Sequence, residues 1–446
     1  MPPPLRLASC LLVTVFTHLP CAGAGSGPAV LPERARTDAV NGLLQDRLDT
    51  LLPRLMRETG IDLWVVLNRE YNEDPVYLTL VPEPAFAARR TTMLVFHDRG
   101  AAAGVERLVV GRYPIADLYE AAWEGGDLDE QWARLGEVIA ERKPRRIGID
   151  VSRDWPVADG LSAALRERLE NVLPPPLRER LVPAEALVVR WLESRTSLEL
   201  ALYPHIVSLA KRVIAEAFSS RVITPGVTTT DDVAWYIRQR FTDLGLPIWF
   251  MPSVDLQRRG LTYAEDESFL GESGLVIEPG DVLHTDVGIT YLRLNTDNQE
   301  MGYVVRPGET EVPEGLRDAL AAGNRWQDLL TAAFRAGRTG NQVLAAALTA
   351  AEAQGLRSSV YSHPLGFFGH GPGPTIGMWD NQGPTPVRGD WPLHPDTVYA
   401  IEGNVIVPVP EWEGQPVQIK LEQGAWFDGE RVIYLAGRQT RWHVVD

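Results

Sequence analysis

Residues 280–299 read GDVLHTDVGITYLRLNTDNQ, and this stretch decides how the second half of the chain is interpreted. Apolar and β-branched residues dominate 281–288 and 290–294, which predicts short strands there. Asp286 and Asp297 lie in or beside these runs. A carboxylate that faces a core costs several kcal/mol unless it is paired or binds a metal. The stretch therefore predicts strands that carry functional acids.

Similar acids and two histidines follow further along the chain. The segment HPLGFFGHGPGP begins at His363 and also contains His370. Glu402 lies in YAIEGNVIV and Glu422 lies in VQIKLEQG, and both are β-type runs. The chain therefore offers four carboxylates and a histidine on or beside predicted strands.

The nearby basic residues are too few to neutralise four acids. Arg293 and Lys420 are the closest in sequence. Lys420 and Glu422 are two residues apart and share a strand face, which is compatible with one ordinary ion pair. Four carboxylates and a histidine suit two divalent cations, such as Mn²⁺, Co²⁺, Fe²⁺ or Zn²⁺. Two cations roughly 3.5–4 Å apart can share carboxylates and a bridging hydroxide, which is a nucleophile at neutral pH.

The order of these motifs resembles a known family. HTDVG, NTD, HPLG, IEG and KLE follow one another as in the dinuclear metallopeptidases of pita-bread fold, which include Xaa-Pro aminopeptidases, prolidases and methionine aminopeptidases. The smaller unit that precedes them resembles the N-terminal domain of the aminopeptidase P, prolidase and creatinase branch. The resemblance implies an α/β fold with a creatinase-like domain at 37–190 and a pita-bread catalytic domain at 195–446.

The resemblance also implies a role for each ligand residue. Asp286 would chelate one metal, and Asp297 and Glu422 would bridge both metals. His363 and Glu402 would hold the other metal. Two Mn²⁺ ions are the expected cofactors, with Co²⁺, Zn²⁺ or Fe²⁺ as alternatives. Glu402 would in addition carry a proton from the bridging water to the leaving amine.

His370 has a different expected role from His363. The family pairs a ligand histidine with a substrate histidine seven residues later, and this spacing makes His363 the ligand. His370 would lie on the substrate side and donate a hydrogen bond to the scissile carbonyl or its oxyanion.

Some positions depart from the family pattern. Members normally carry another histidine upstream of the first metal aspartate, but the segment DESFLGESG at 266–274 contains none. His284 precedes Asp286 by two residues, so both side chains are expected on one strand face. It is interpreted as a core histidine with satisfied hydrogen bonds, although it could instead lend a proton donor to the site. IEGN replaces the family's IEPG, and Pro364 replaces a common glycine.

The predicted function is metal-dependent hydrolysis of N-terminal peptide bonds by an Xaa-Pro aminopeptidase, with a dinuclear site and a bridging hydroxide. A prolidase that cleaves dipeptides, or a related C–N hydrolase, is the alternative within the fold. Creatinase-type members lack the metal ligands, whereas this chain has all five. A non-catalytic binding protein on the same fold is the alternative from another class. Family members often form dimers or tetramers, so a homo-oligomer is also compatible with the sequence.

The composition excludes several other classes. The chain has 446 residues, 45% hydrophobic and 23% charged, as in soluble globular proteins. The formal net charge of −16 would repel a phosphate backbone, so a nucleic acid is not an expected partner. The partner that the resemblance implies is a peptide substrate. The three lysines, Lys143, Lys211 and Lys420, do not follow a glycine, which excludes a Walker A loop. HExxH and GxSxG motifs are absent.

The N-terminus predicts export. Arg6 precedes an apolar run that is too short to span a bilayer, and Ala22-Gly23-Ala24 has the A-x-A pattern of a cleavage site. Residues 1–24 are therefore predicted to be a signal peptide, with lipidation at Cys21 as the second choice. The mature chain would contain neither cysteine nor a membrane span, and it would be periplasmic or secreted.

The remaining expectations concern secondary structure and single side chains. Helices are predicted at 39–59, 128–142, 160–172, 198–219, 228–244, 314–336 and 341–354. Strands are predicted at 61–67, 92–96, 108–110, 147–150, 302–305, 398–409, 417–422 and 432–435. His97 and His394 are expected in loops, His205 on a helix surface, and His443 exposed. Six aromatic residues could line a proline pocket or belong to the core: Trp249, Phe250, Phe367, Phe368, Trp379 and Trp426.

Overall fold

The computed structural model of the protein describes residues 30–261 and 274–446. The predicted signal peptide lies outside the described residues, as does nearly all of the upstream segment that lacks a histidine. Export therefore stays a prediction. Within the described part of the chain, no helix is both long and apolar enough to cross a membrane.

The first sheet has six strands in the order β4-β3-β2-β1-β5-β6. Successive side chains of strand β1 point to opposite faces of this sheet. Leu63, Val65 and Leu67 face one helical layer, whereas Trp64 and Val66 face the other. The strands are β1 (Leu63–Arg69), β2 (Thr91–Asp98), β3 (Val105–Gly111), β4 (Glu120–Ala121), β5 (Ile147–Ile149) and β6 (Leu181–Pro183).

Helices cover both faces of this first sheet. The layer on one face includes α2 and α7, and the layer on the other face includes α4 and α5. The helices are α1 (Glu33–Asp46), α2 (Leu52–Thr59), α3 (Tyr77–Leu80), α4 (Leu128–Arg142), α5 (Ala163–Val172), α6 (Pro175–Arg178) and α7 (Glu185–Glu193). A π-helical turn, Arg47–Leu51, joins α1 to α2, and short 3-10 turns lie at Ala116–Leu118 and Pro156–Ala158.

The second sheet has nine strands, with the central order β12-β14-β15-β11-β8-β7. β13 pairs with β14, β16 with β15, and β17 with β11. The strands are β7 (Ser253–Gln257), β8 (Val282–Val287), β11 (Asn298–Val304), β12 (Arg357–Val360), β13 (His363–Leu365), β14 (Thr397–Pro408), β15 (Pro416–Phe427), β16 (Val432–Tyr434) and β17 (His443–Val445). A separate two-stranded hairpin contains β9 (Thr290–Tyr291) and β10 (Leu294–Asn295).

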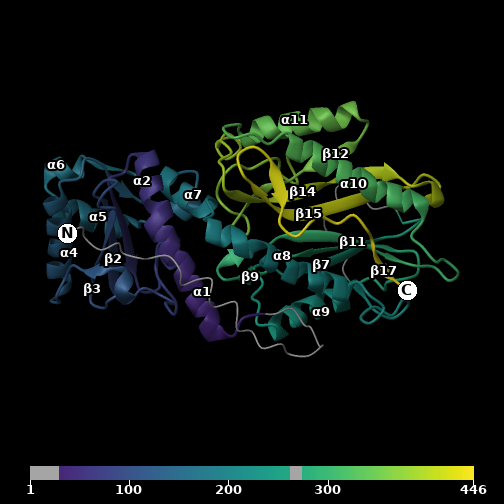
Figure 1. Ribbon diagram of the computed structural model, residues 1–446, viewed down its shortest axis with the longest axis horizontal. Helices are drawn as coiled ribbons and strands as arrows, with labels where there is room; N and C mark the ends of the chain where they lie inside the picture. Colours follow the sequence, from purple (N-terminus) through teal and green to yellow (C-terminus); the bar gives the residue numbers. More distant parts are fainter. Residues whose placement is uncertain (1–29, 262–273) are drawn as a thin grey trace, which may run out of the picture.

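Two pairs of helices sandwich the second sheet (Figure 1). Along β14, Val398 and Ala400 pack in the cluster of α8 and α9, whereas Tyr399 and Ile401 pack in the cluster of α10 and α11. This alternation is the period of two that a strand with two covered faces requires. The helices are α8 (Ser197–Ala217), α9 (Thr230–Asp243), α10 (Glu314–Ala332) and α11 (Gly340–Ala353), with a 3-10 turn at Pro410–Trp412.

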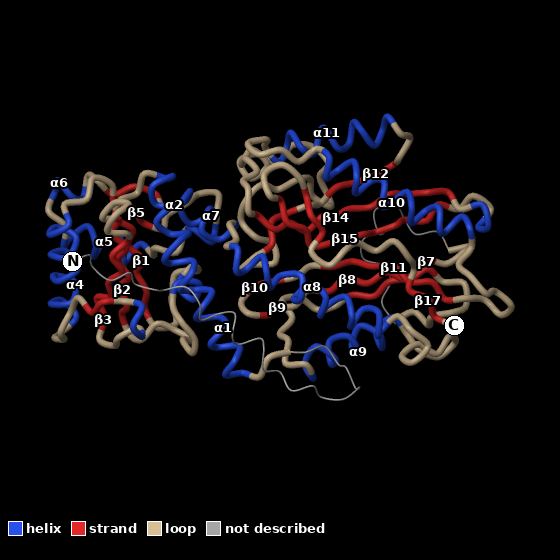
Figure 2. The backbone as a smooth tube through the Cα atoms, in the orientation of Figure 1, coloured by secondary structure: helices blue, strands red, loops and turns tan. Residues whose placement is uncertain are grey.

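The two sheets lie in separate parts of the elongated molecule, with α1, α7 and α8 between them (Figures 1 and 2). This arrangement confirms the α/β fold with two successive units. The first sheet uses residues 63–183 and the second uses 253–445, inside the predicted ranges. The predicted domain boundaries themselves stay a prediction.

Several details correct the sequence-based expectations. His97 belongs to strand β2 rather than to a loop, and its Nδ1 lies 3.4 Å from Glu106 Oε2. His443 is half-buried on β17 rather than exposed, because its Nε2 lies 2.6 Å from buried Glu300. Six strands are additional to the predicted ones: β4, β6, β7, β12, β13 and β17. His205 and His394 lie on a helix surface and in a loop, as expected.

Candidate active site

Strand register brings the predicted acids together. On adjacent strands β14 and β15, Glu402 lies directly opposite Glu422. On β11, Gln299 pairs with Glu422 on one side and with Asp286 of β8 on the other. Asp297 immediately precedes β11. Four carboxylates from β8, β11, β14 and β15 therefore meet at one place in the sheet.

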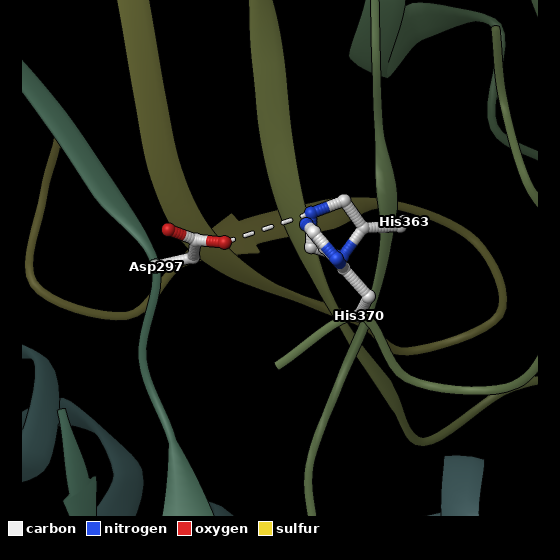
Figure 3. Close-up of side chains that lie close together, drawn as sticks. All are labelled: Asp297, His363 and His370. Atoms are coloured by element: carbon white, nitrogen blue, oxygen red, sulfur yellow. Dashed lines mark ion pairs between the residues drawn. The ribbon is translucent and has the colours of Figure 1, made fainter. Parts of the chain in front are cut away.

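His363 completes this cluster from β13, where it pairs with Ala400 of β14. Its Nε2 lies 3.7 Å from Asp297 Oδ2 and 3.7 Å from Glu402 Oε2. The same nitrogen lies 3.8 Å from Glu422 Oε1. Figure 3 shows the contact between Asp297 and His363, with His370 beside it. All five predicted ligand residues thus lie in one cluster.

The donor atoms of this cluster group into overlapping triads. In each triad one potential ligand atom per residue lies within 4.8 Å of the others. The triads are Asp286, Asp297 and Glu422; His363, Glu402 and Glu422; and Asp297, His363 and His370. Asp297, His363 and Glu422 each belong to two triads, and of these three only the carboxylates of Asp297 and Glu422 have two oxygens with which to bridge two cations.

The cluster is buried but lacks hydrogen-bond partners for its inner atoms. Asp297, His363, Glu402 and Glu422 are each at most 4% exposed. Within the described part of the chain, the atoms without a partner include Asp286 Oδ1, Asp297 Oδ1, His363 Nε2 and both carboxylate oxygens of Glu422. Buried polar atoms are normally hydrogen-bonded, so this group of acceptors fits divalent cations.

Electrostatics supports the same interpretation. Burial raises the pKa of Asp286 to about 7. Burial, followed by repulsion from neighbouring carboxylates, raises the pKa of Asp297, Glu402 and Glu422 well above their usual range. Burial lowers the pKa of His363 to about 3, which keeps its ring neutral and able to ligate. Bound cations would relieve the repulsion among the carboxylates and hold them ionised.

His370 lies at the open side of the cluster. Its ring centroid is 4.7 Å from that of His363 and 5.1 Å from that of Trp249. Unlike His363, His370 is exposed. This geometry separates a buried histidine that faces the carboxylates from an exposed one that can meet a ligand.

Trp249 forms a rigid wall beside His370. Its indole Nε1 donates to the carbonyl of Thr296 at 2.8 Å. Its ring fills space against Gly288 and Gly369, where a methyl group at either glycine would overlap it. Phe250 contacts Trp249 edge to face, with ring centroids 4.4 Å apart. These two aromatic residues therefore belong to the site region.

The other four aromatic residues are placed differently. Phe367 lies under two buried guanidinium groups, those of Arg47 and Arg195. Phe368 packs against the core of the first unit, Trp426 on β15 packs against the cluster of α8 and α9, and Trp379 is 55% exposed. The sequence alone could not show which of the six aromatic residues line the site and which belong to the core, because the distinction depends on long-range packing.

Three further residues around the cluster had not been predicted. Gln299 donates from Nε2 to Glu402 Oε1 at 2.8 Å. Asp255 of β7 pairs with Lys420 at 3.2 Å, so an acid other than Glu422 accompanies this lysine. The Tyr361 ring lies 5.4 Å from the His363 ring and 5.8 Å from the His370 ring. Tyr361 lies between β12 and β13, two residues before His363, and this spacing was the available signal.

A buried pita-bread site with four carboxylates and a histidine defines a metal-dependent hydrolase. The family model for metallopeptidase family M24 matches residues 203–427. This chain belongs to metallopeptidase family M24. No curated protein matches the sequence.

Solved structures of the same fold are distant in sequence. The X-Pro aminopeptidase of Thermotoga maritima MSB8 is 17% identical with a TM-score of 0.61, covering 88% of this chain and 100% of its own. The Xaa-Pro dipeptidase of Bacillus anthracis is 15% identical with a TM-score of 0.56, covering 92% and 100%. Aminopeptidase P of Escherichia coli, as a His-to-Ala variant, is 13% identical with a TM-score of 0.54, covering 89% and 95%. These similarities confirm the two-unit fold.

Proposed function

We propose that this metallopeptidase is an Xaa-Pro aminopeptidase that removes the first residue of a peptide whose second residue is proline. The observation that carries the proposal is the buried cluster of five ligand residues, whose inner oxygen and nitrogen atoms lack hydrogen-bond partners in the described structure. The family assignment supports peptide hydrolysis. The proline preference is the finer part of the proposal.

The five residues would hold two divalent cations, with Mn²⁺ proposed first. Asp286 would bind one cation, His363 and Glu402 the other, and the two shared carboxylates would bridge them. When bound, such cations supply Lewis acidity and lower the pKa of a bound water enough for attack at neutral pH. Carboxylate oxygens dominate the donor set, which suits Mn²⁺ better than a soft metal.

Two side chains would move or hold protons during hydrolysis. Glu402 faces the cluster through Oε2, and it would accept the proton of the attacking water and deliver it to the leaving amine. His370 would donate a hydrogen bond to the oxyanion that develops on the scissile carbonyl. Its exposed position next to the cluster supports this role.

The aromatic wall beside His370 supports proline as the neighbouring residue. The Trp249 ring lies 5.1 Å from the His370 ring, and Phe250 packs edge to face on Trp249. A pyrrolidine ring is compact and rigid, so it can pack on such a surface at a low cost in conformational entropy. A prolidase would share this feature, and it remains the second candidate because the fold matches an Xaa-Pro dipeptidase.

The test compares three substrates on the Mn²⁺-loaded protein. An Xaa-Pro-Xaa tripeptide should be hydrolysed at its first bond, an Xaa-Pro dipeptide should react at least tenfold more slowly, and an Xaa-Ala-Xaa tripeptide should react slowest. A preference for the dipeptide would instead identify a prolidase. Metal binding without turnover of any of these peptides would favour the non-catalytic alternative.

We further propose that the protein acts outside the cytoplasm. The proposal rests on the signal-peptide pattern of residues 1–24. Peptides in the periplasm or the surrounding medium would then be its substrates. Cell fractionation of the native producer, with N-terminal sequencing of the mature protein, tests both the compartment and cleavage after Ala24.

A further inference from the structure

A continuous line of buried polar side chains lies behind the carboxylate cluster. It starts at Lys420 on β15 and passes through Asp255 on β7, His284 on β8 and Gln299 on β11. It ends at Glu402, the proposed ligand and proton carrier. All five side chains are at most 6% exposed. The proposed hydrolysis uses only the last of them.

Each link in this line has hydrogen-bonding geometry. Lys420 Nζ lies 3.2 Å from both carboxylate oxygens of Asp255. Asp255 Oδ2 lies 2.8 Å from His284 Nδ1, and His284 Nε2 lies 3.0 Å from Gln299 Oε1. Gln299 Nε2 donates to Glu402 Oε1 at 2.8 Å and lies 3.4 Å from Asp286 Oδ2.

The carboxylates determine how the Gln299 amide is oriented. The amide nitrogen faces Glu402 and Asp286, and a carboxylate that holds a cation is ionised and can only accept a hydrogen bond. The amide oxygen then faces His284 Nε2 at 3.0 Å, and His284 Nδ1 faces Asp255 Oδ2 at 2.8 Å. The ion pair of Asp255 with Lys420 in turn holds the histidine ring in place. An inverted amide would set its oxygen against two carboxylates, which the line prevents.

This arrangement gives the two oxygens of Glu402 different surroundings. Oε1 accepts the hydrogen bond from Gln299, whereas Oε2 lies 3.7 Å from His363 Nε2, inside the ligand cluster. The side chain is therefore turned so that one oxygen faces the cations' position. Partners behind a ligand commonly fix its orientation and tune its affinity for metal.

We propose that His284 and Gln299 are positioning residues that orient Glu402 and so preset the site for divalent cations. The proposal rests on the proposed metal site, and it adds two residues that act through Glu402 without touching the cations. His284 is a hydrogen-bonded core residue, as the sequence indicated. The proposal gives it a role at the site through Gln299 and not as a proton donor.

The first experiment titrates chelator-stripped protein with Mn²⁺ by calorimetry. Gln299→Met keeps the shape of the side chain but cannot donate to Glu402, so Mn²⁺ affinity should fall about 10- to 100-fold. Gln327→Met is the matched control, because Gln327 is buried and its Nε2 donates to a backbone carbonyl on the same strand β14. The control should retain the wild-type affinity even if it unfolds at a lower urea concentration.

A second pair of variants asks which nitrogen of His284 matters. Glutamine places its amide where Nε2 lies, whereas asparagine places it where Nδ1 lies. His284→Gln should therefore stay within about threefold of wild-type affinity, and His284→Asn should lose affinity as Gln299→Met does. If His284 had only a structural role, Mn²⁺ affinity would not be higher in His284→Gln than in His284→Asn.

The outcomes distinguish failure of the proposed function from failure of the positioning role. Failure of the wild-type protein to bind Mn²⁺ would overturn the proposed function itself. Wild-type binding with unchanged affinity in Gln299→Met would overturn the positioning role alone. Equal loss in His284→Gln and His284→Asn would also contradict it, and this pair decides the matter if Gln299→Met does not fold.

Discussion

At the scale of single residues, the two histidines of the site differ in burial more than in distance from the acids. His363 is 4% exposed and faces three carboxylates, whereas His370 is exposed at the open side. We therefore predict that His370→Ala retains both cations and lowers kcat about 100-fold, the usual effect of one lost oxyanion donor. Elemental analysis and steady-state kinetics on the same preparation measure both quantities.

His363→Ala is the matched variant for this prediction. It should lose metal as well as activity, because it removes a neutral nitrogen donor from the buried cluster. If His370→Ala emptied the site while His363→Ala kept its metal, the two roles would be reversed.

At the scale of elements, the loop after β13 depends on tight packing between glycine and tryptophan. Gly369 faces the Trp249 ring so closely that a methyl group would overlap it. Gly369→Ala should displace Trp249 and disturb the neighbouring His370, lowering kcat/KM at least tenfold with metal content unchanged. Gly42→Ala is the control, since a methyl group at Gly42 in α1 meets no atom within 4 Å. Equal kinetics in both variants would show that the wall has no role.

A pair of buried acids at the end of β5 predicts how stability depends on pH. Burial raises the pKa of Asp74 to about 6, and burial and Asp74 raise that of Asp150 well above its usual range. The folded state thus holds a proton that the unfolded chain releases near pH 4. The contribution of this proton to the free energy of unfolding is fully present below pH 4 and is lost as the pH rises through about 6. Asp74→Asn should remove the part of this dependence that Asp74 contributes, while burial still raises the pKa of Asp150.

Urea unfolding at pH 4.5 and pH 7.5 tests this prediction. Relative to wild type, Asp74→Asn should gain stability at pH 7.5 by up to about 3 kcal/mol, the energy of a shift from the usual value to about 6. It should gain little at pH 4.5. A difference between the two proteins that does not change with pH would contradict the shared proton.

Local signals explain which elements the sequence could predict. The range 128–142 agrees with α4 at both ends, and this amphipathic helix begins with a capping box formed by Asp127 and Glu130. The strands that carry Asp286, Glu402 and Glu422, namely β8, β14 and β15, were likewise predicted from apolar runs. Gln299 and Asp255 could not be predicted, because their importance arises from register across β7, β8 and β11. The π-helical turn at Arg47–Leu51 has no local signal that distinguishes it from an α-helix.

At the scale of the whole molecule, a buried charge cluster joins the first unit to the loop after β13, which contains Phe367 and His370. Arg47 and Arg195 share the single carboxylate of Glu199, and both guanidinium groups lie over Phe367. Because two cations share one anion, Glu199→Gln should cost about 3–5 kcal/mol of unfolding free energy. Arg47→Met should cost less, since burial already lowers the pKa of Arg47 to about 10. Urea unfolding would contradict this if Arg47→Met were the more destabilised variant.

The most direct test of the central claim is the metal content of the purified protein after loading with Mn²⁺, compared with Asp297→Ala and coupled to hydrolysis of an Xaa-Pro-Xaa peptide. Asp297 belongs to two of the ligand triads, so its loss should disrupt both cation positions. The account predicts close to two cations per wild-type chain with release of the first residue, and an empty, inactive variant. A wild-type chain that binds no cation, or an Asp297→Ala variant that keeps both cations and full activity, would contradict it.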